Sequence, residues 1–156
     1  MRITGFVVAA LLFVAPAAFA APCEQNTLEI KDGAVTASFQ IEVAVTPQEQ
    51  SRGLMFVESM PQFSGMLFTY HEPRPVAFWM KNTVIPLDIL FIDQSGTVQK
   101  IHHNATPYST DTIPGGNNIQ FVFEINGGLS AMLGLGEGAV IRHPDIPSAL
   151  AAWPCE

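Results

Sequence analysis

Residues 35–53 read VTASFQIEVAVTPQEQSRG and predict a β-strand followed by a short α-helix. Apolar and polar side chains alternate from Val35 to Val45, which is the period of a strand with one buried face. Thr46 then precedes a proline at the first helical position and a glutamate three residues on, the pattern of a capping box. We therefore expect the helix to begin after Thr46 and to end at Gly53.

Strand-like segments continue on the C-terminal side of this pair. The apolar stretches 76–81 and 87–92 are joined by the short link 83–86, which favours a β-hairpin. Residues 104–118 hold two prolines and two glycines without periodicity, and irregular loops of this length are often functional. The remaining expected elements are a turn at 93–96, strands at 97–103, 119–125 and 139–143, and a short helix at 129–133.

The connections between these segments decide the expected fold class. Most of them are too short to hold the crossover helices that join parallel strands. We therefore expect an α+β, β-rich fold, with mainly antiparallel strands forming a barrel or sandwich and one or two short helices. Residues 21–156 show no repeat or linker and predict a single globular domain.

Residues 1–20 have the three-part layout of a secretory signal peptide. Arg2 precedes the apolar run 6–14 and then Ala18-Phe19-Ala20, which predicts cleavage after Ala20. No later segment offers the ~20 apolar residues of a membrane span. We therefore expect export to the periplasm or the extracellular space, without membrane insertion after signal cleavage.

The two cysteines, Cys23 and Cys155, lie at opposite ends of the mature chain. In an oxidising compartment such a pair usually forms a disulfide. A catalytic redox pair would instead be spaced as Cys-x-x-Cys. The spacing thus predicts a structural disulfide that joins the two ends.

The charge balance narrows the class of partner. Seven Lys and Arg face fourteen Asp and Glu, for a net charge of −7, and the basic residues do not cluster. Binding to nucleic acid or to an anionic membrane depends on basic side chains that neutralise a polyanion. The expected partner is therefore an unknown small molecule or an envelope protein, and not nucleic acid.

Four short blocks occur in order along the chain: Arg52-Gly53-Leu54-Met55, Gly65-Met66-Leu67-Phe68, the run FWMKNT at 78–83, and Pro86-Leu87-Asp88. Together they resemble the signature of the prokaryotic family called domain of unknown function 192. The resemblance extends over about residues 36–142. It implies a compact β-rich domain and carries no established activity, substrate or cofactor, so we expect no cofactor.

Asp88 raises the question of what a carboxylate does in an apolar strand. Within 87–92 its side chain shares a face with Leu90 and Ile92, and a buried carboxylate must be paired or neutralised. One interpretation is a structural ion pair with Arg52 or Lys81 that locks the helix to the sheet.

The other interpretation of Asp88 is a small-ligand pocket, because polar groups that converge over an apolar wall are how such sites are built. The residues that we predict for this pocket are Arg52, Met55, Trp79, Met80, Asn82, Thr83 and Asp88. Trp79 and Met80 alternate along the predicted strand, so one of the two should be exposed. A small-ligand or partner-binding module is therefore our main functional hypothesis, and a purely structural envelope protein stays open beside it.

Two other functions also stay open. A copper site suits the thioethers and imidazoles of Met55, Met60, Met66, Met80, His102 and His103, although methionine is a common core residue. It would require three of the four sulfurs to converge. A hydrolase-like enzyme would require a histidine from this region beside Asp88 at an open cleft. Since the usual catalytic motifs are absent from the sequence, we favour binding over catalysis.

Overall fold

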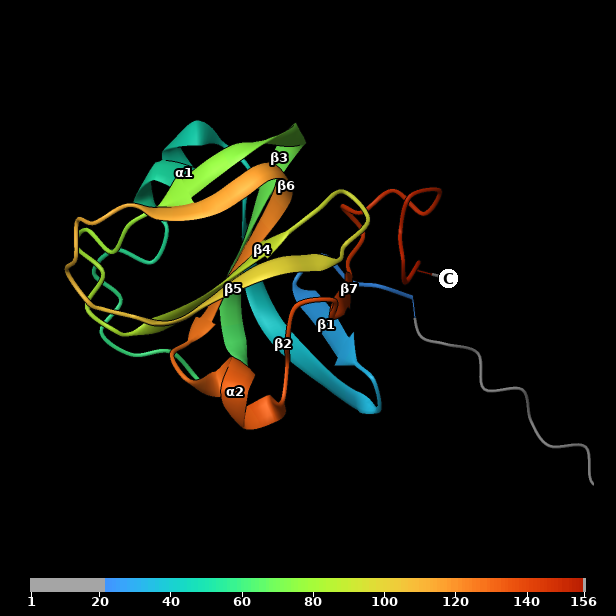
Figure 1. Cartoon of the computed structure of the whole chain (residues 1–156), viewed down its shortest axis with the longest axis horizontal. Coiled ribbons are helices and arrows are strands. Elements are labelled where there is room, and N and C mark those ends of the chain that lie inside the picture. The colour runs from blue at the N-terminus through green and yellow to red at the C-terminus, as the bar shows by residue number, and fades with distance from the viewer. Residues whose placement is uncertain (1–21, 156) are drawn as a thin grey trace, which may run out of the picture.

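A computed structural model describes residues 22–155, so the predicted signal peptide lies outside the described residues. Its strands form one curved seven-stranded sheet in the order β5-β4-β6-β3-β2-β1-β7, shaped as a half-barrel (Figure 1). The elements in chain order are β1 (Thr27–Asp32), β2 (Val35–Ala44), α1 (Pro47–Arg52), β3 (Ser64–Phe78), β4 (Leu87–Ile92), β5 (Val98–Ala105), β6 (Ile113–Asn126), α2 (Leu129–Leu133) and β7 (Val140–Arg142). The predicted α+β, β-rich class is confirmed. Neither helix of residues 22–155 is long and apolar enough to cross a membrane.

The strands pair antiparallel, as expected, with the exception of β2 and β3. These two run parallel, because the connection between them is long enough to cross over the sheet and contains α1. The two edges of the sheet meet where Thr97, just before β5, bridges Val140 of β7. The predicted barrel is therefore formed only in part.

Helix α1 begins and ends as its sequence predicts. The Thr46 hydroxyl accepts a hydrogen bond from the Glu49 amide at 3.3 Å, and the Glu49 carboxylate accepts one from the Thr46 amide at 2.8 Å. The backbone amides of Thr46 and Val45 thereby lower the pKa of Glu49. Gly53 ends the helix at φ 47°, and a Cβ added there would lie 3.2 Å from the Phe68 ring.

The predicted hairpin between 76–81 and 87–92 is wrong. Val76 to Phe78 instead form the end of β3, which pairs with β6, while β4 lies between β5 and β6. All six residues of β4 are buried, so the strand is covered on both faces and takes its neighbours from distant parts of the chain.

The long loop expected at 104–118 is also shorter than predicted. Strand β5 continues to Ala105 and β6 begins at Ile113, which leaves only 106–112 as loop. Gly115 allows this extension of β6, because a Cβ there would meet the Phe91 ring at 2.1 Å. Strand β1 was not predicted at all.

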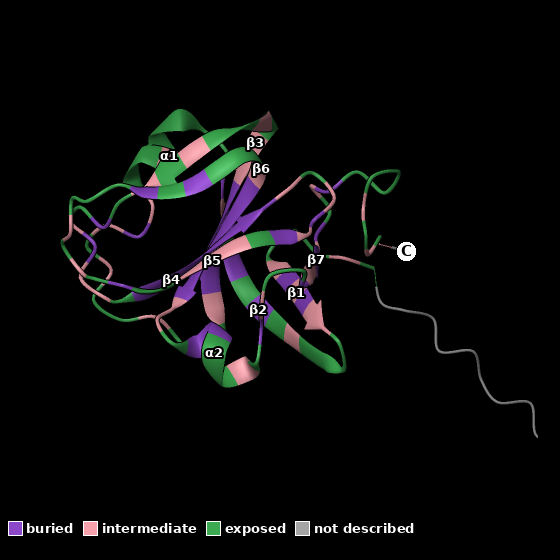
Figure 2. Ribbon diagram, in the orientation of Figure 1, coloured by how far each residue is buried: buried purple, intermediate pink, exposed green. Residues whose placement is uncertain are grey.

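The core lies on both faces of the sheet, and buried residues concentrate in its central strands (Figure 2). One set, the α2-side core, includes Leu90, Phe121, Phe123, Ile125 and Leu129. The other set, the α1-side core, includes Leu54, Phe68, Met80, Ile89, Phe91 and Val122. Strands β4 and β6 contribute alternate residues to the two cores.

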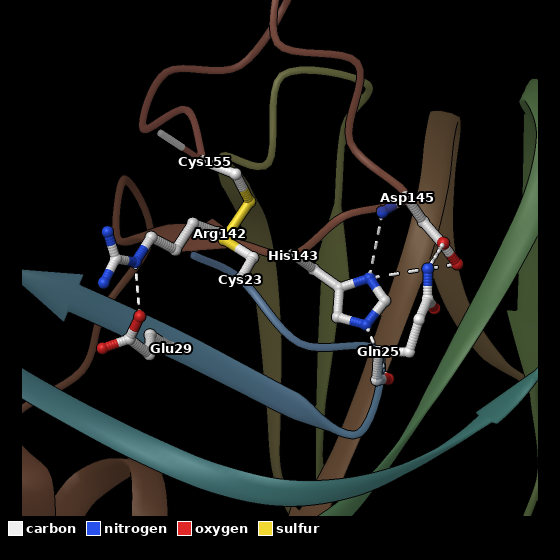
Figure 3. Close-up of a disulfide and its surroundings, with 7 residues drawn as sticks. All are labelled: Cys23, Gln25, Glu29, Arg142, His143, Asp145 and Cys155. Carbon is white, nitrogen blue, oxygen red and sulfur yellow. Dashed lines mark hydrogen bonds and ion pairs between the residues drawn. A yellow bond between two sulfur atoms is a disulfide. The ribbon is translucent and has the colours of Figure 1, made fainter. Parts of the chain in front are cut away.

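The predicted disulfide between Cys23 and Cys155 is present, with the two Cα atoms 5.6 Å apart (Figure 3). Beside it Arg142 pairs with Glu29. His143 is fully buried, with its Nε2 donating to the Gln25 carbonyl at 3.0 Å and its Nδ1 accepting from the Asp145 amide at 3.2 Å. The two ends of the described chain are thus joined by covalent and polar contacts together.

Candidate functional site

Asp88 is fully buried and its carboxylate accepts four hydrogen bonds. The backbone amides of Asn104, Gly128 and Ser130 donate at 2.7, 2.9 and 2.8 Å, and the Ser130 hydroxyl donates at 2.6 Å. Burial favours the neutral acid, but the hydrogen bonds from Ser130, Gly128 and Asn104 outweigh it and lower the pKa of Asp88. Asp88 therefore connects β4 to the end of β5 and to the start of α2.

The ion pair expected between Asp88 and Arg52 or Lys81 is not formed. Among residues 22–155 neither cation makes a salt bridge with any carboxylate. Backbone amides and a hydroxyl take the place of the cation, because the turn before α2 directs several N–H groups at one point. The predicted ion pair is therefore wrong, and the partners that a buried carboxylate requires are backbone amides and a hydroxyl instead.

Ser130 also contacts His103, whose Nδ1 lies 2.9 Å from the Ser130 hydroxyl oxygen. Since the Ser130 hydroxyl donates its proton to Asp88, the His103 Nδ1 must donate to Ser130. In a hydrolytic triad the histidine stands between the serine and the acid and accepts the serine proton. Here the serine stands in the middle and is fully buried, so the geometry does not match the hydrolase hypothesis.

A cleft of about 240 Å³ lies on the opposite side of the sheet, between the end of α1, strand β3 and the turn after β3. It brings together four of the seven predicted site residues, Arg52, Met55, Trp79 and Thr83. Phe68 and Phe78 add apolar walls, and their rings meet edge to face at 5.0 Å.

The other three predicted site residues do not line this cleft. Asp88 faces the α2-side core, and Met80 is fully buried in the α1-side core. Asn82 lies next to the cleft, with its amide nitrogen 3.9 Å from the Met55 sulfur. The expectation that Trp79 or Met80 would be exposed is confirmed, since 49% of Trp79 is exposed.

Glu124 is the residue of the cleft that the sequence did not reveal. It lies on β6 between Met66 of β3 and Ile89 of β4, and only 4% of it is exposed. Within residues 22–155 its carboxyl group has no hydrogen-bond or ion-pair partner, and burial raises its pKa to about 8. At neutral pH it is therefore a protonated acid that can both donate and accept a hydrogen bond.

The sequence did not single out Glu124, because the alternation in its strand predicts one solvent-exposed face. The alternation placed Glu124 with Val122 and Gln120 on the polar face of 119–125. In the structure that face carries Val122 into the α1-side core and Glu124 into the cleft. The apolar Val122 beside Glu124 was the available signal that both faces are covered.

Tyr70 is a second polar residue of the cleft and is half-buried. Burial raises the pKa of its hydroxyl, the positive charge of Arg74 opposes this rise, and the negative form of Glu124 adds to it. The guanidinium of Arg74 lies 5.5 Å from the centre of the Tyr70 ring. Tyr70 thus stays a neutral hydrogen-bond donor next to Glu124.

The rim of the cleft carries positive charge. Arg52 and Lys81 are exposed and both line it. The Lys81 ammonium lies 5.1 Å from the centre of the Trp79 ring. No acidic residue other than Glu124 lines the cleft in the part of the chain that the structure describes.

The four methionines proposed as copper ligands do not all lie in one place. Met55, Met60 and Met66 line a second cleft of about 580 Å³ along β2 and α1, whereas Met80 is buried. His103 contacts Ser130, and His102 lies on β5 opposite Ile89. In the described residues no three His, Cys, Asp or Glu side chains gather as a metal site.

Comparisons place the chain among proteins without an assigned activity. The family model DUF192, described as "Uncharacterized ACR", matches residues 27–143. A crystal structure of a proposed transcription regulator from Sinorhizobium meliloti 1021 is 35% identical, with a TM-score of 0.73 over 79% of this chain and 96% of that one. A protein of unknown function from Novosphingobium aromaticivorans DSM 12444 is 36% identical, with a TM-score of 0.72 over 78% of this chain and 92% of that one. No curated protein matches the chain.

Proposed function

We propose that this chain, which belongs to the uncharacterised DUF192 family, is a binding module for small organic anions. The observation that carries the proposal is the buried carboxyl group of Glu124. It makes no hydrogen bond or ion pair within residues 22–155, and since no fully buried side-chain oxygen there lacks a partner, its carboxyl group opens onto the cleft. A ligand in the cleft that hydrogen-bonds to this carboxyl group fits the arrangement.

The charges of the cleft select the class of ligand. Arg52 and Lys81 line it and make no salt bridge within the described residues, so an anionic group of the ligand would give them a partner. Glu124 and Tyr70 would hydrogen-bond to its polar atoms, and Phe68 would contact its apolar part. The volume of about 240 Å³ is below the usual range for drug-sized ligands and suits a small molecule or one unit of a longer one.

Binding is a better account of this cleft than hydrolysis. Glycoside hydrolysis needs two carboxyl groups, and the cleft has only Glu124 within the described residues. Ser51 and Thr83 also line it, but the Thr83 hydroxyl donates to the Lys81 carbonyl at 3.4 Å and no histidine lines the cleft in residues 22–155. A nucleophile with an adjacent base is therefore missing from the described part.

Export is part of the proposal. A disulfide between Cys23 and Cys155 suits an oxidising compartment, and residues 1–20 predict a signal peptide. The periplasm or the extracellular space is therefore the proposed location. The description of the Sinorhizobium meliloti protein as a proposed regulator of transcription is not extended to this chain, because its net charge of −7 opposes binding to DNA.

Thermal unfolding of the mature, oxidised protein tests the proposed function. We expect a panel of small carboxylates, phosphate esters and sulfate esters to contain compounds that raise the Tm, since a ligand at about 100 times its Kd adds ~2.7 kcal/mol. Arg52→Ala and Glu124→Leu should abolish the shift. Lys31→Ala, which removes a cation beside Trp153 far along the sheet, should retain it.

Two results would contradict the proposal. One is a panel without any Tm shift. The other is a shift of equal size in wild type, Arg52→Ala and Glu124→Leu, which would place the anion elsewhere.

A second candidate function is the binding of Cu(I) by Met55, Met60 and Met66. The supporting observation is that these three thioether residues line one cleft. Soft thioether ligands favour Cu(I) over harder cations. Competition with a Cu(I) chelator should show one site per chain that Met60→Leu removes, while Met132→Leu on α2 leaves it intact. Equal copper uptake by both variants would exclude it.

A further inference from the structure

Three loops at one end of the half-barrel are held together by backbone hydrogen bonds (Figure 1, left side). The Phe56 amide donates to the Asn82 carbonyl at 2.9 Å, and the Tyr108 amide donates to the Thr83 carbonyl at 3.1 Å. The Met80 amide donates to Ser109 at 2.9 Å. The loop that contains residues 79–83 is therefore fixed from both sides.

Backbone strain concentrates in these loops. Four residues other than glycine have positive φ in the described chain, and three of them are Phe56 at 66°, Asn82 at 57° and Tyr108 at 62°. This conformation is unfavourable for bulky aromatic residues. Strained backbone that the surrounding structure maintains often marks a functional site.

The strained positions place aromatic side chains in solvent. Phe56 is 70% exposed and Tyr108 is 62% exposed, and Trp79 on the third loop is 49% exposed. None of the three packs against another aromatic ring within residues 22–155. We call Phe56, Trp79 and Tyr108 the aromatic platform. All three are large exposed rings on loops that backbone hydrogen bonds join to one another, and exposed aromatic side chains often serve in binding.

The platform borders the proposed anion cleft. Trp79 belongs to both. Phe56 directly follows Met55, which lines the cleft, and the Tyr108 amide donates to the carbonyl of Thr83, which lines it too. The Lys81 ammonium lies over the Trp79 ring, so a cation and an exposed aromatic face stand side by side. Because Trp79 belongs to both, a ligand in the cleft can contact the platform at this ring.

We propose that the cleft and the aromatic platform together bind an acidic saccharide, a sugar chain with a carboxylate on at least one unit. This inference rests on the proposed function, in which Arg52 and Lys81 hold an anion. Sugar rings offer flat C–H faces that pack on exposed aromatic rings, and hydroxyl groups that pair with the neutral Glu124 and Tyr70. Their carboxylate matches Arg52 and Lys81, which make no salt bridge within residues 22–155. A nucleic acid strand also stacks on aromatic rings, but the net charge of −7 opposes it.

Isothermal titration of the mature protein with trigalacturonate and with uncharged galactotriose tests the inference. We expect trigalacturonate to bind at least about tenfold more tightly than galactotriose, because only the acid engages Arg52 and Lys81. Trp79→Ala should weaken the binding of trigalacturonate about tenfold. Met132→Ala, which removes a side chain that is 65% exposed on α2, should leave it unchanged.

Phe56→Gly and Tyr108→Gly separate binding from folding. Glycine adopts positive φ without strain, so both variants should keep or raise the Tm. Both should still bind trigalacturonate several-fold more weakly, because they remove platform rings. Unchanged affinity in both variants would overturn the aromatic platform as a binding surface.

The outcomes also distinguish this inference from the proposed function. If small monocarboxylates raise the Tm in an Arg52-dependent way while trigalacturonate does not bind, the saccharide inference fails and the anion cleft stands. If no anion of any class binds, both fail. Equal affinity for trigalacturonate and galactotriose would overturn the requirement for an acidic sugar.

Discussion

Asp88 and Glu124 lie on the neighbouring strands β4 and β6, with side chains on opposite faces of one sheet. Both are almost completely buried, yet their surroundings differ. Asp88 accepts four hydrogen bonds and its pKa is lowered, whereas Glu124 has no partner in residues 22–155 and burial raises its pKa to about 8. The contrast shows that burial alone does not decide the preferred state of a carboxyl group, because hydrogen-bond donors keep Asp88 charged while burial without them favours the neutral form of Glu124.

The same contrast extends to the side chains around each acid. On the α2 side, Ser130 and His103 complete a hydrogen-bonded chain that begins at Asp88. On the α1 side, Arg52 and Lys81 surround an open cleft without ion pairs among the described residues. On the α2 side the polar side chains hydrogen-bond to one another. On the α1 side the charged side chains of the cleft have no such partners among the described residues.

The largest expected effect is that of Asp88→Ala on stability. Removing the acceptor leaves the buried Ser130 amide and the part-buried Asn104 and Gly128 amides without this partner, and the Ser130 hydroxyl with His103 alone, which should lower the free energy of unfolding by about 3 to 5 kcal/mol. Urea denaturation measures the change. A loss below about 1 kcal/mol would contradict the view that the hydrogen bonds of Asp88 stabilise the fold.

The pH dependence of stability should differ in direction for the two acids. The folded-state pKa of Glu124, about 8, is above its ordinary value of 4.5, so the folded protein holds this proton more tightly than the unfolded chain. Its contribution to stability is present below pH 4.5 and is lost as the pH rises to about 8. The loss is at most about 1.4 kcal/mol for each pH unit of that window.

Glu124→Gln isolates this contribution. The variant cannot ionise at the position, so the difference in unfolding free energy between wild type and variant should fall from pH 5 to pH 8, measured by urea denaturation at each pH. A flat difference would mean that Glu124 is already charged at neutral pH. For Asp88 the pKa is lowered, so its contribution is present at neutral pH and is lost on acidification through the folded-state pKa.

Ser130→Ala, on the α2 side of the sheet, should lower the free energy of unfolding less than Asp88→Ala does. It removes one of the four donors to Asp88 and the contact with His103, at a cost of about 1 to 3 kcal/mol. The Tm shifts of ligands in the cleft should be unchanged, because Ser130 lies on the other face. A loss of ligand binding in this variant would show that the two faces are not independent.

Tyr108→Gly should have the smallest effect, and with the opposite sign. Relief of the positive φ, worth about 1 to 2 kcal/mol, exceeds the added unfolded-state entropy of glycine, about 0.5 to 1 kcal/mol, so the free energy of unfolding should rise by up to about 1 kcal/mol. A measurable loss of stability would show that the Tyr108 ring supports the loops, which would remove the argument that strain is maintained there for binding.

Features that depend on residues close together in the sequence could be predicted. The alternation in β2, the capping box of α1 and the position of α2 were confirmed, because strand period and helix caps are local. The disulfide was also confirmed, since a chain with two cysteines allows one intramolecular pairing.

Features that depend on distant strands could not be predicted in this way. The place of β4 between β5 and β6 follows from burial on both faces, which an apolar run of six residues does not specify. For the same reason the sequence indicated that Asp88 needs a partner, but it did not indicate which backbone amides provide one. Glu124 was missed because a polar residue in an alternating strand predicts contact with solvent.

The disulfide also has a mechanical consequence. Cys23 and Cys155 are separated by 132 positions in sequence, but their Cα atoms are 5.6 Å apart. If the protein were pulled at its two ends, tension would pass from one end to the other through this covalent bond. The seven strands between the cysteines would carry little of the load, so the shape of the cleft would not depend on how the ends are tethered.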